Sequence, residues 1–312
     1  MTTIVVALGG NAILQRGQQG TAREQLKNLQ NTSRQIAQLI RESYRVVITH
    51  GNGPQVGNIL IQNELGETMI PRMPMDICGA QSQGMIGYML QMSIGNALRE
   101  HGMNVPVTSV ITQTLVDRND PAFQNPTKPV GPFKDYQYAM NRQQSLGETW
   151  IEDSGRGWRR VVPSPEPKEI IEAASIRKLV EAGHAVVSVG GGGIPVVMGD
   201  SGMLEGVEAV VDKDLGAERL AHAVGASILL ILTDVPGACL NFRTPQEQPI
   251  GSVSLDELMR YEKEGHFRAG SMGPKVKAII RFVQRGGEIG IVASLDEALP
   301  ALKGQAGTRV TR

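Results

Sequence analysis

Cysteine is scarce in this chain, and neither sign of charge dominates it. The 312 residues include two cysteines, Cys78 and Cys239, which lie far apart and form no C-x-x-C pair. This spacing argues against a zinc site or a disulfide framework, so a reducing compartment is expected. Lys and Arg number 31, as do Asp and Glu, so no global field favours nucleic acid or anionic lipid as a partner. Any anion site must therefore be local.

Targeting signals and long apolar runs are also lacking. The chain begins with a strand pattern rather than the basic and apolar segments of a signal peptide. Its longest apolar candidate, residues 84–98, is interrupted by Gln and Asn. It falls short of the roughly 20 apolar residues that a membrane-spanning helix needs. We expect no membrane partner and a cytoplasmic location.

The common phosphate-binding motifs are absent as well. The segment GNGPQVG at 51–57 is not G-x-G-x-x-G, because its third glycine falls one position late. The chain contains no G-x-x-x-x-G-K-[ST] sequence and no H-R-D and D-F-G pair. These absences argue against a dinucleotide-binding Rossmann domain, a P-loop enzyme and a protein kinase.

Apolar runs alternate with helical patterns along most of the chain, which predicts an α/β fold around a mainly parallel sheet. At this length, one large domain or two smaller ones are possible. Helices are expected over residues 21–43 and 76–101. The expected strands begin the chain and then occupy residues 45–50, 105–116, 184–197, 226–240 and 288–294.

Residues 117–165 interrupt this alternation. They contain several prolines, both tryptophans (Trp150 and Trp158) and no sustained helical period. Connections of this length are usually lids, binding loops or disordered segments. The aromatic residues favour a small folded unit, so we predict an inserted subdomain here.

Three predicted strands end in glycine-rich turns, at residues 8–12, 50–55 and 189–195. In a parallel sheet, turns from strand to helix gather at the carboxyl ends of the strands, where ligands bind. Glycine lets backbone N–H groups approach an anion, and the N-terminus of each following helix favours negative charge. A single such turn is as well explained by backbone needs alone. Three on one edge predict a phosphate site.

Lysines at unusual positions supply the positive charge that such a site needs. Lys128 lies between two prolines, whereas Lys213 and Asp214 open one predicted helix and Lys275 lies near the start of another. A lysine at a helix N-terminus opposes the helix dipole, and residues that break a local rule tend to be functional. Solvated surface lysines and an ordinary first-turn aspartate remain the alternative.

Taken together, seven segments resemble the motif set of the carbamate kinases, a branch of the amino acid kinase family. They occur in the family's order from residue 4 to about 285: VVALGGNA, HGNGPQVG, MDICGAQSQGMIGY, NPTKPVGPF, GGGGIPVV, VDKDLGAERLA and GHFRAGSMGPKVKA. The resemblance implies one domain over 1–312, a three-layer α/β/α sandwich with a protruding lid over 117–165. It also implies a phosphate-acceptor half over roughly 1–200 and a nucleotide half over 201–312.

The implied reaction is reversible, Mg²⁺-dependent phosphoryl transfer from carbamoyl phosphate to ADP, giving ATP and carbamate. Such transfer is catalysed by positioning and charge stabilisation, and the acceptor or leaving oxygen needs no general base. The histidines show no metal-binding spacing, and the resemblance implies that Mg²⁺ is bound with the nucleotide. The family also implies a homodimer. Members serve arginine or purine catabolism, and the sequence does not choose between these routes.

The resemblance assigns roles to individual residues. The implied catalytic set is Lys128, Lys213, Asp214 and Lys275, with Asp214 orienting the lysines. The implied phosphate and carbamate contacts are Gly9, Gly10, Asn11, Gly51, Asn52, Gly53, Gly191 and Gly192. The implied nucleotide contacts are Thr233, Asp234, Gly237, Met272 and Gly273. Arg268, beside the GSMGPK turn, departs from the small residues or proline expected there.

Two other functions remain to be weighed. Kinases of the same fold that act on acetylglutamate or aspartate carry a lysine in the first strand, where this chain has Ala7. Lys128 would take over that function here. A ligand sensor on this fold is the other alternative, but sensors commonly lose the charged catalytic residues that this chain retains.

Overall fold

Strand β1 (Thr3–Leu8) lies in the middle of an eight-stranded sheet. The computed structural model describes residues 1–153, 155–267 and 272–312. The strand order is β15-β17-β16-β12-β1-β2-β9-β3, and the pairings are parallel except between β16 and β17. The predicted mainly parallel sheet is therefore confirmed. The remaining bounds are β2 Arg45–His50, β3 Val107–Ser109, β9 Ala185–Val187, β12 Ile228–Thr233, β15 Ser252–Ser254, β16 Ile289–Ser294 and β17 Thr308–Thr311.

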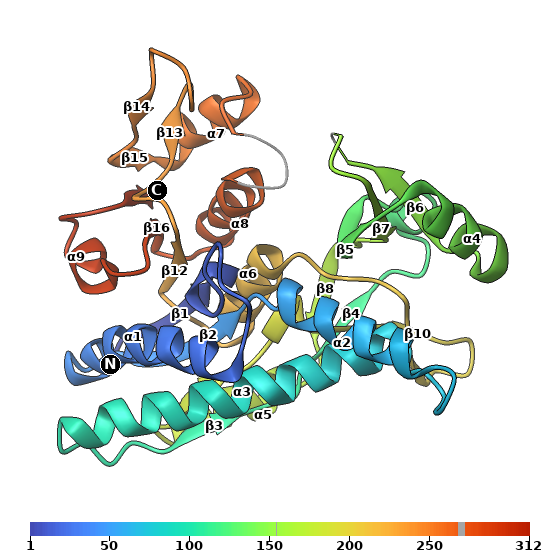
Figure 1. Ribbon diagram of the computed structural model, residues 1–312. Helices are drawn as coiled ribbons and strands as arrows, with labels where there is room; N and C mark the ends of the chain where they lie inside the picture. Colours follow the sequence, from blue (N-terminus) through green and yellow to red (C-terminus); the bar gives the residue numbers. More distant parts are fainter. Residues whose placement is uncertain (154, 268–271) are drawn as a thin grey trace.

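Helices cover both faces of this sheet, which gives the three layers (Figure 1). One face packs against α1 (Ala22–Arg41), α3 (Met75–Glu100) and α9 (Ala298–Leu302), and the other against α5 (Ala173–Glu181), α6 (Lys213–Ala223) and α8 (Met272–Gln284). In β1, Ile4, Val6 and Leu8 join the first core, whereas Val5 and Ala7 join the second. A strand buried on both faces needs such a continuous apolar run.

Residues 105–116, which we predicted as a single strand, are divided between two sheets, so that prediction is wrong. Residues 184–197 form the predicted strand running into glycines, but a second strand that we did not predict follows the glycines. Residues 105–116 form β3 and then β4 (Gln113–Val116), and residues 184–197 form β9 and then β10 (Ile194–Met198). Strands β4 and β10 belong to a separate four-stranded sheet, β11-β10-β4-β8, with β11 at Leu204–Gly206 and β8 at Pro167–Ile170.

Specific contacts produce these breaks. The Gln83 side chain, from α3, binds both the N–H and the carbonyl of Thr112, at 2.8 and 3.1 Å, and holds the bend between β3 and β4. Gly191 to Gly193 adopt positive φ angles of 67°, 93° and 88°, which glycine tolerates best. These angles turn the chain from β9 through a short 3₁₀ turn (Gly190–Gly192) into β10.

A small unit projects from the body between β4 and β8 (Figure 1). Strands β5 (Lys128–Lys134), β7 (Trp158–Val162) and β6 (Thr149–Glu152) form a three-stranded antiparallel sheet. Helix α4 (Tyr136–Leu146) lies between β5 and β6 in sequence. We call residues 128–162 the lid unit; they fall within the inserted segment 117–165.

The remaining elements complete the upper left of Figure 1 and the approach to the lid unit. They are the 3₁₀ turns Gly10–Ala12 and Pro121–Phe123, α2 Gly53–Gly66, α7 Leu255–Lys263, β13 Cys239–Leu240 and β14 Gln248–Pro249. Among the described helices, none combines the length and apolar character that crossing a bilayer requires.

Candidate active site

The three glycine-rich turns meet because β1, β2 and β9 are neighbours in the sheet. A Cβ on Gly51 would lie 3.3 Å from the N of Gly10, and one on Gly191 would lie 2.3 Å from Nδ2 of Asn52. Side chains at these positions would fill the space between the turns. The turns therefore present backbone to a common site, as the sequence predicted.

The expectation that all three turns run from strand to helix is wrong in part. The turn after β2 opens α2 directly at Gly53, but the turn after β9 leads into strand β10. The turn after β1 passes through a short 3₁₀ segment long before α1 begins at Ala22. The glycine turns thus contribute closely approaching backbone and one helix N-terminus, that of α2, rather than three converging helix dipoles.

Three lysines from three separate elements gather around two carboxylates. Nζ of Lys128, on the lid unit, lies 2.8 Å from Oδ2 of Asp212. Lys213, at the start of α6, forms an ion pair with Oδ1 of Asp214, and Nζ of Lys275, on α8, lies 3.4 Å from Oδ2 of the same residue. Asp214 thus holds two of the lysines together.

The sequence analysis missed Asp212, although it directly precedes the KD pair. Its Oδ1 caps α6 by accepting the N–H of Asp214 at 2.9 Å, which leaves Oδ2 for Lys128. Burial alone would raise the pKa of Asp212, but the charge and hydrogen bond of Lys128 hold it below its usual range. A helix cap and an ion-pair partner are combined in one residue.

Lys275 is the most deeply buried of the three ammonium groups, with 13% of its side chain exposed. Burial lowers its pKa, Asp214 opposes that shift and Lys213 adds to it by repulsion. An anion placed beside this lysine would favour its charged form. The site is therefore electrostatically suited to a dianionic phosphoryl group.

Two cavities meet at these lysines. One has a volume of about 410 Å³ and the other about 300 Å³, and Gly10, Pro54, Lys213 and Lys275 line both. The smaller cavity is bounded by Lys128, Asp212 and Asp214. A group bound at the junction can therefore touch ligands in either cavity.

The structure places most of the predicted residues in these cavities. The larger one is lined by Gly9, Gly10, Asn11, Thr233, Asp234, Gly237 and Met272, and the smaller one by Gly10, Gly51, Asn52, Gly53 and Gly191. Asn11, which we predicted beside the phosphate, donates from Nδ2 to Oδ2 of Asp234 at 2.8 Å. The larger cavity also contains residues that the sequence did not reveal: Leu14, Val235, Cys239, Phe242, His266 and Phe267.

Within the described chain, Gly192 and Gly273 line neither cavity. The carbonyl of Gly192 accepts a hydrogen bond from Oγ1 of Thr114 at 2.8 Å, and a Cβ on Gly216 would lie 2.9 Å from Cα of Gly192. Gly192 and the glycine in the first turns of α6 therefore serve close packing. Arg268 lies outside the described residues.

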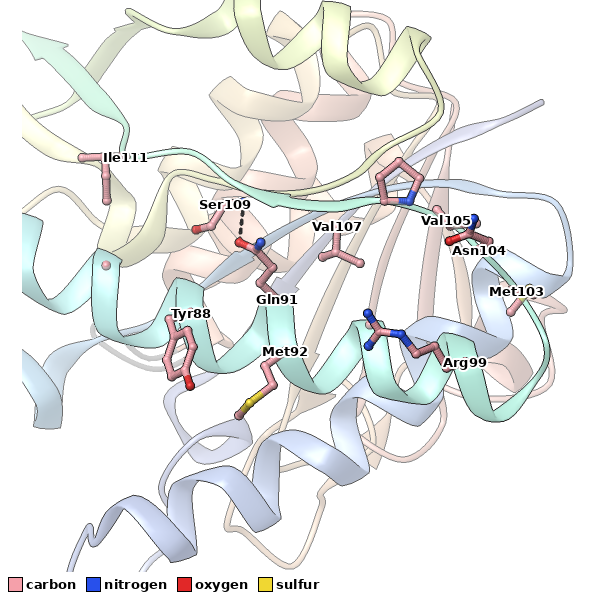
Figure 2. A pocket seen from close by; sticks show the side chains of 13 residues that line it. Tyr88, Gln91, Met92, Arg99, Met103, Asn104, Val105, Val107, Ser109 and Ile111 are labelled. Carbon is pink, nitrogen blue, oxygen red and sulfur yellow. Dashed lines mark hydrogen bonds between the residues drawn. The ribbon is translucent and has the colours of Figure 1, made fainter.

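A further cavity, of about 550 Å³, lies between α3 and β3. Figure 2 shows Gln91 pointing from the helix towards Ser109, whose N–H donates to it at 3.3 Å. Tyr88, Met92 and Arg99 lie on the same helix and also line the cavity. This cavity is remote from the lysine cluster in the fold and has no carboxylate in its described lining. It is not the candidate active site.

The comparisons with known proteins agree with this geometry. A sequence model of the amino acid kinase family matches residues 2–294. The chain therefore belongs to the amino acid kinase family. Its fold is that of this family, and its relatives identify it as a phosphotransferase.

Its full-length relatives define the branch. The carbamate kinase of Thermococcus kodakarensis is 56% identical over 315 residues, which cover 100% of each chain. That of Pyrococcus furiosus is also 56% identical, over 98% of each. The structure of carbamate kinase from Giardia lamblia bound to AMP-PNP superposes with a TM-score of 0.95 at 44% identity, covering 99% of this chain and 98% of the other. The resemblance to carbamate kinases is confirmed over the whole chain.

Proposed function

We propose that the enzyme transfers a phosphoryl group between carbamoyl phosphate and Mg²⁺-bound ADP, forming ATP and carbamate. One observation carries the proposal: Lys213 and Lys275 line both of two adjoining cavities, and Lys128 lines the smaller one. The relative bound to AMP-PNP supports an adenine nucleotide in the larger cavity.

The mechanism requires the two substrates to meet in line at the transferred phosphorus. Carbamoyl phosphate would occupy the smaller cavity, with backbone N–H groups of the Gly10 and Gly51 turns beside its phosphoryl oxygens. Lys213 and Lys275, held by Asp214, would stabilise the negative charge that spreads over those oxygens. Two unit charges about 4 Å apart interact by roughly 4 kcal/mol at an effective dielectric of 20. Several lysines therefore supply a large effect without a general base.

Mg²⁺ binds through phosphate oxygens, water and one or two carboxylates in such enzymes. Asp234 offers a carboxylate in the lining of the larger cavity, and this donor chemistry fits the ion. When bound with the nucleotide, Mg²⁺ would neutralise phosphate charge. Asn11 and Thr233 contact the Asp234 carboxylate at 2.8 and 3.1 Å and would fix its orientation.

The lid unit supplies Lys128, which suggests that substrate binding and lid position are coupled. The Lys128–Asp212 pair joins the lid unit to the start of α6. We propose that the lid closes over carbamoyl phosphate, excludes water and brings Lys128 to the substrate. Limited proteolysis tests this proposal: saturating carbamoyl phosphate should protect the chain between residues 117 and 165, whereas equal cleavage with and without ligand would contradict closure.

We also propose a homodimer formed through the α3–β3 face. Strand β3 is an edge of the main sheet, and beside it Tyr88 and Ile111 are 64% and 47% exposed. An exposed edge with large apolar side chains favours association. Analytical sedimentation of the Tyr88→Glu variant should show a shift towards monomer.

We also propose a location in the reducing cytoplasm, which the two free cysteines support.

The first test of function is ATP formation from ADP, Mg²⁺ and carbamoyl phosphate by the purified protein. Acetyl phosphate as the donor, and N-acetylglutamate with ATP, serve as comparison reactions. Rapid turnover with carbamoyl phosphate alone would support the proposal. Turnover of N-acetylglutamate, or nucleotide binding without transfer, would contradict it.

A further inference from the structure

Arg159 is a fourth cation at the smaller cavity, and neither the motifs nor the comparisons assign it a role. It lies on β7 of the lid unit and, within the described chain, lines the cavity of about 300 Å³ together with Lys128 but not the larger one. Any role for this arginine in binding carbamoyl phosphate rests on the proposed function.

The guanidinium group is held in place mainly by uncharged groups. Its Nη2 donates to the carbonyl of Gly131 at 3.0 Å, and its Cζ lies 5.2 Å from the centre of the Phe133 ring. Gly131 has a φ of 70° and lies where the β5–β7 register shifts, between Val130 and Lys134. An irregularity in the lid sheet therefore turns a carbonyl towards this arginine.

The charge on Arg159 is less well compensated than that on the lysines. Its Nη1 lies 4.0 Å from Oδ2 of Asp153, whereas Lys128 has a carboxylate oxygen at 2.8 Å. Its Nε is buried and has no hydrogen-bond partner in the described structure. Burial lowers the pKa of this guanidinium, but arginine remains protonated in proteins. With its carboxylate partner at 4.0 Å, the guanidinium can still bind an anionic acceptor in the cavity that it lines.

The arrangement of the cavities indicates which part of the substrate supplies that acceptor. Gly10, Lys213 and Lys275 line both cavities and so mark the position of the transferred phosphoryl group. In-line transfer places the carbamoyl group on the side away from the nucleotide. Arg159 and Lys128 lie on that side, since they line the smaller cavity alone.

We propose that Arg159 binds the carbamoyl end of carbamoyl phosphate, and the carboxylate-like oxygens of carbamate in the reverse direction. The planar guanidinium fork matches planar carboxylate geometry, whereas a lysine offers a point charge. Arg159 is thus a substrate-positioning residue presented by the lid unit, distinct from the lysines that stabilise the phosphoryl group.

Steady-state kinetics of Arg159→Ala and Arg159→Lys test this assignment. Loss of a charged hydrogen bond should raise KM for carbamoyl phosphate about 10- to 100-fold in Arg159→Ala, with KM for ADP within twofold of wild type. Arg159→Lys, which keeps the charge but not the fork, should recover part of the loss. In the reverse reaction, KM for carbamate should rise and KM for ATP should not.

Arg156→Ala is the matched control, because Arg156 lies in the same hairpin and also contacts the Phe133 ring but is 62% exposed. It should behave like wild type. Unchanged KM for carbamoyl phosphate in Arg159→Ala, equal rises for both substrates, or the same effect in the control would overturn the inference. Thermal melting shows whether Arg159→Ala is folded. If it is not, the kinetics of Arg159→Lys still test the proposal. Absence of turnover in the wild type would refute the proposed function itself.

Discussion

Lys128 and Asp212 lie 84 residues apart in sequence, yet Nζ of one lies 2.8 Å from Oδ2 of the other. The lysine comes from the lid unit and the aspartate caps the helix that begins with Lys213. The pair therefore fixes the lid unit against the site at which phosphoryl transfer is proposed. Substitutions at this pair and among its neighbours should change activity and stability in distinct ways.

Removal of the Lys128 charge should impair the proposed reaction severely. We expect Lys128→Ala to reduce turnover about 100-fold or more, the effect of losing one preorganised charge-stabilising donor. Lys134→Ala is the control, because Lys134 lies on the same strand but contacts the Tyr138 ring instead. A coupled assay of ATP formation measures the turnover of both variants. Near-normal kinetics in Lys128→Ala would refute the proposed role of Lys128.

Lys275 should be as important, whereas Lys277 should not. Lys275→Ala removes a buried ammonium group at the junction of the cavities, and we expect turnover to fall about 100-fold or more. Lys277, two residues later, is paired with Glu166 and its side chain is 41% exposed. Lys277→Ala should stay within a few-fold of wild type. Similar losses in both variants would show a general disturbance of α8.

The pH dependence should report the lowered pKa of Lys275. In the free enzyme, burial favours its neutral form, so kcat/KM for carbamoyl phosphate should fall as pH rises through a pKa below that of an ordinary lysine. The bound dianion favours the ammonium form, so the corresponding limb in kcat should move to higher pH. In Lys275→Arg, the fall of kcat/KM at alkaline pH should disappear. An unchanged alkaline fall in this variant would show that another group causes it.

Glu148 should stabilise the lid unit. Its side chain is 3% exposed and accepts from Nε and Nη2 of Arg142, at 2.9 and 2.7 Å, and from Nε1 of Trp150 at 3.0 Å. Breaking a buried pair leaves an uncompensated charge, so Glu148→Gln should lower the free energy of unfolding by about 3 kcal/mol. Chemical denaturation monitored by tryptophan fluorescence measures this change, and an unaltered midpoint would contradict it.

The same carboxylate should make the lid unit sensitive to acid. Burial alone would raise the pKa of Glu148, but Arg142, Arg160 and Trp150 hold it below its ordinary 4.5. A carboxyl with a lowered pKa stabilises the fold fully above its unfolded pKa and loses that contribution as pH falls through the folded value. Below pH 4.5, the ordinary pKa of this group, wild type should therefore lose more stability than Glu148→Gln. An equal loss of stability with falling pH in wild type and in Glu148→Gln would contradict the assignment.

Gly216 should resist replacement despite its helical position. Alanine is favoured over glycine in a helix by about 1 kcal/mol, but a Cβ here would lie 2.9 Å from Cα of Gly192. Overpacking against backbone costs about 1–3 kcal/mol, so Gly216→Ala should be destabilising. Gly79→Ala, where a Cβ would meet no described atom within 4 Å, should be neutral or stabilising. Equal thermal shifts in both variants would contradict the packing argument.

Local patterns in the amino-acid sequence predicted the mainly parallel sheet and covering helices such as α1 and α3, whereas most of the candidate site residues came from the resemblance of the motifs to those of the carbamate kinases. Continuous apolar runs and apolar residues at helical spacing are local properties of the chain. Once the sheet is parallel, the strand ends bring residues such as Gly10 and Gly51 together. The lysines stood out because they oppose a local helix preference.

The pairing of those residues, and the identity of the neighbours that join them, depended on the three-dimensional arrangement. Strand breaks at Thr112 and Gly191 depend on contacts from α3 and on backbone angles that composition does not reveal. The partnership of Lys128 with Asp212, and the presence of Arg159 at the cavity, depend on how the lid unit sits against α6. Side-chain pairing across long sequence separations is set by packing of whole elements, and no local pattern in the chain specifies it.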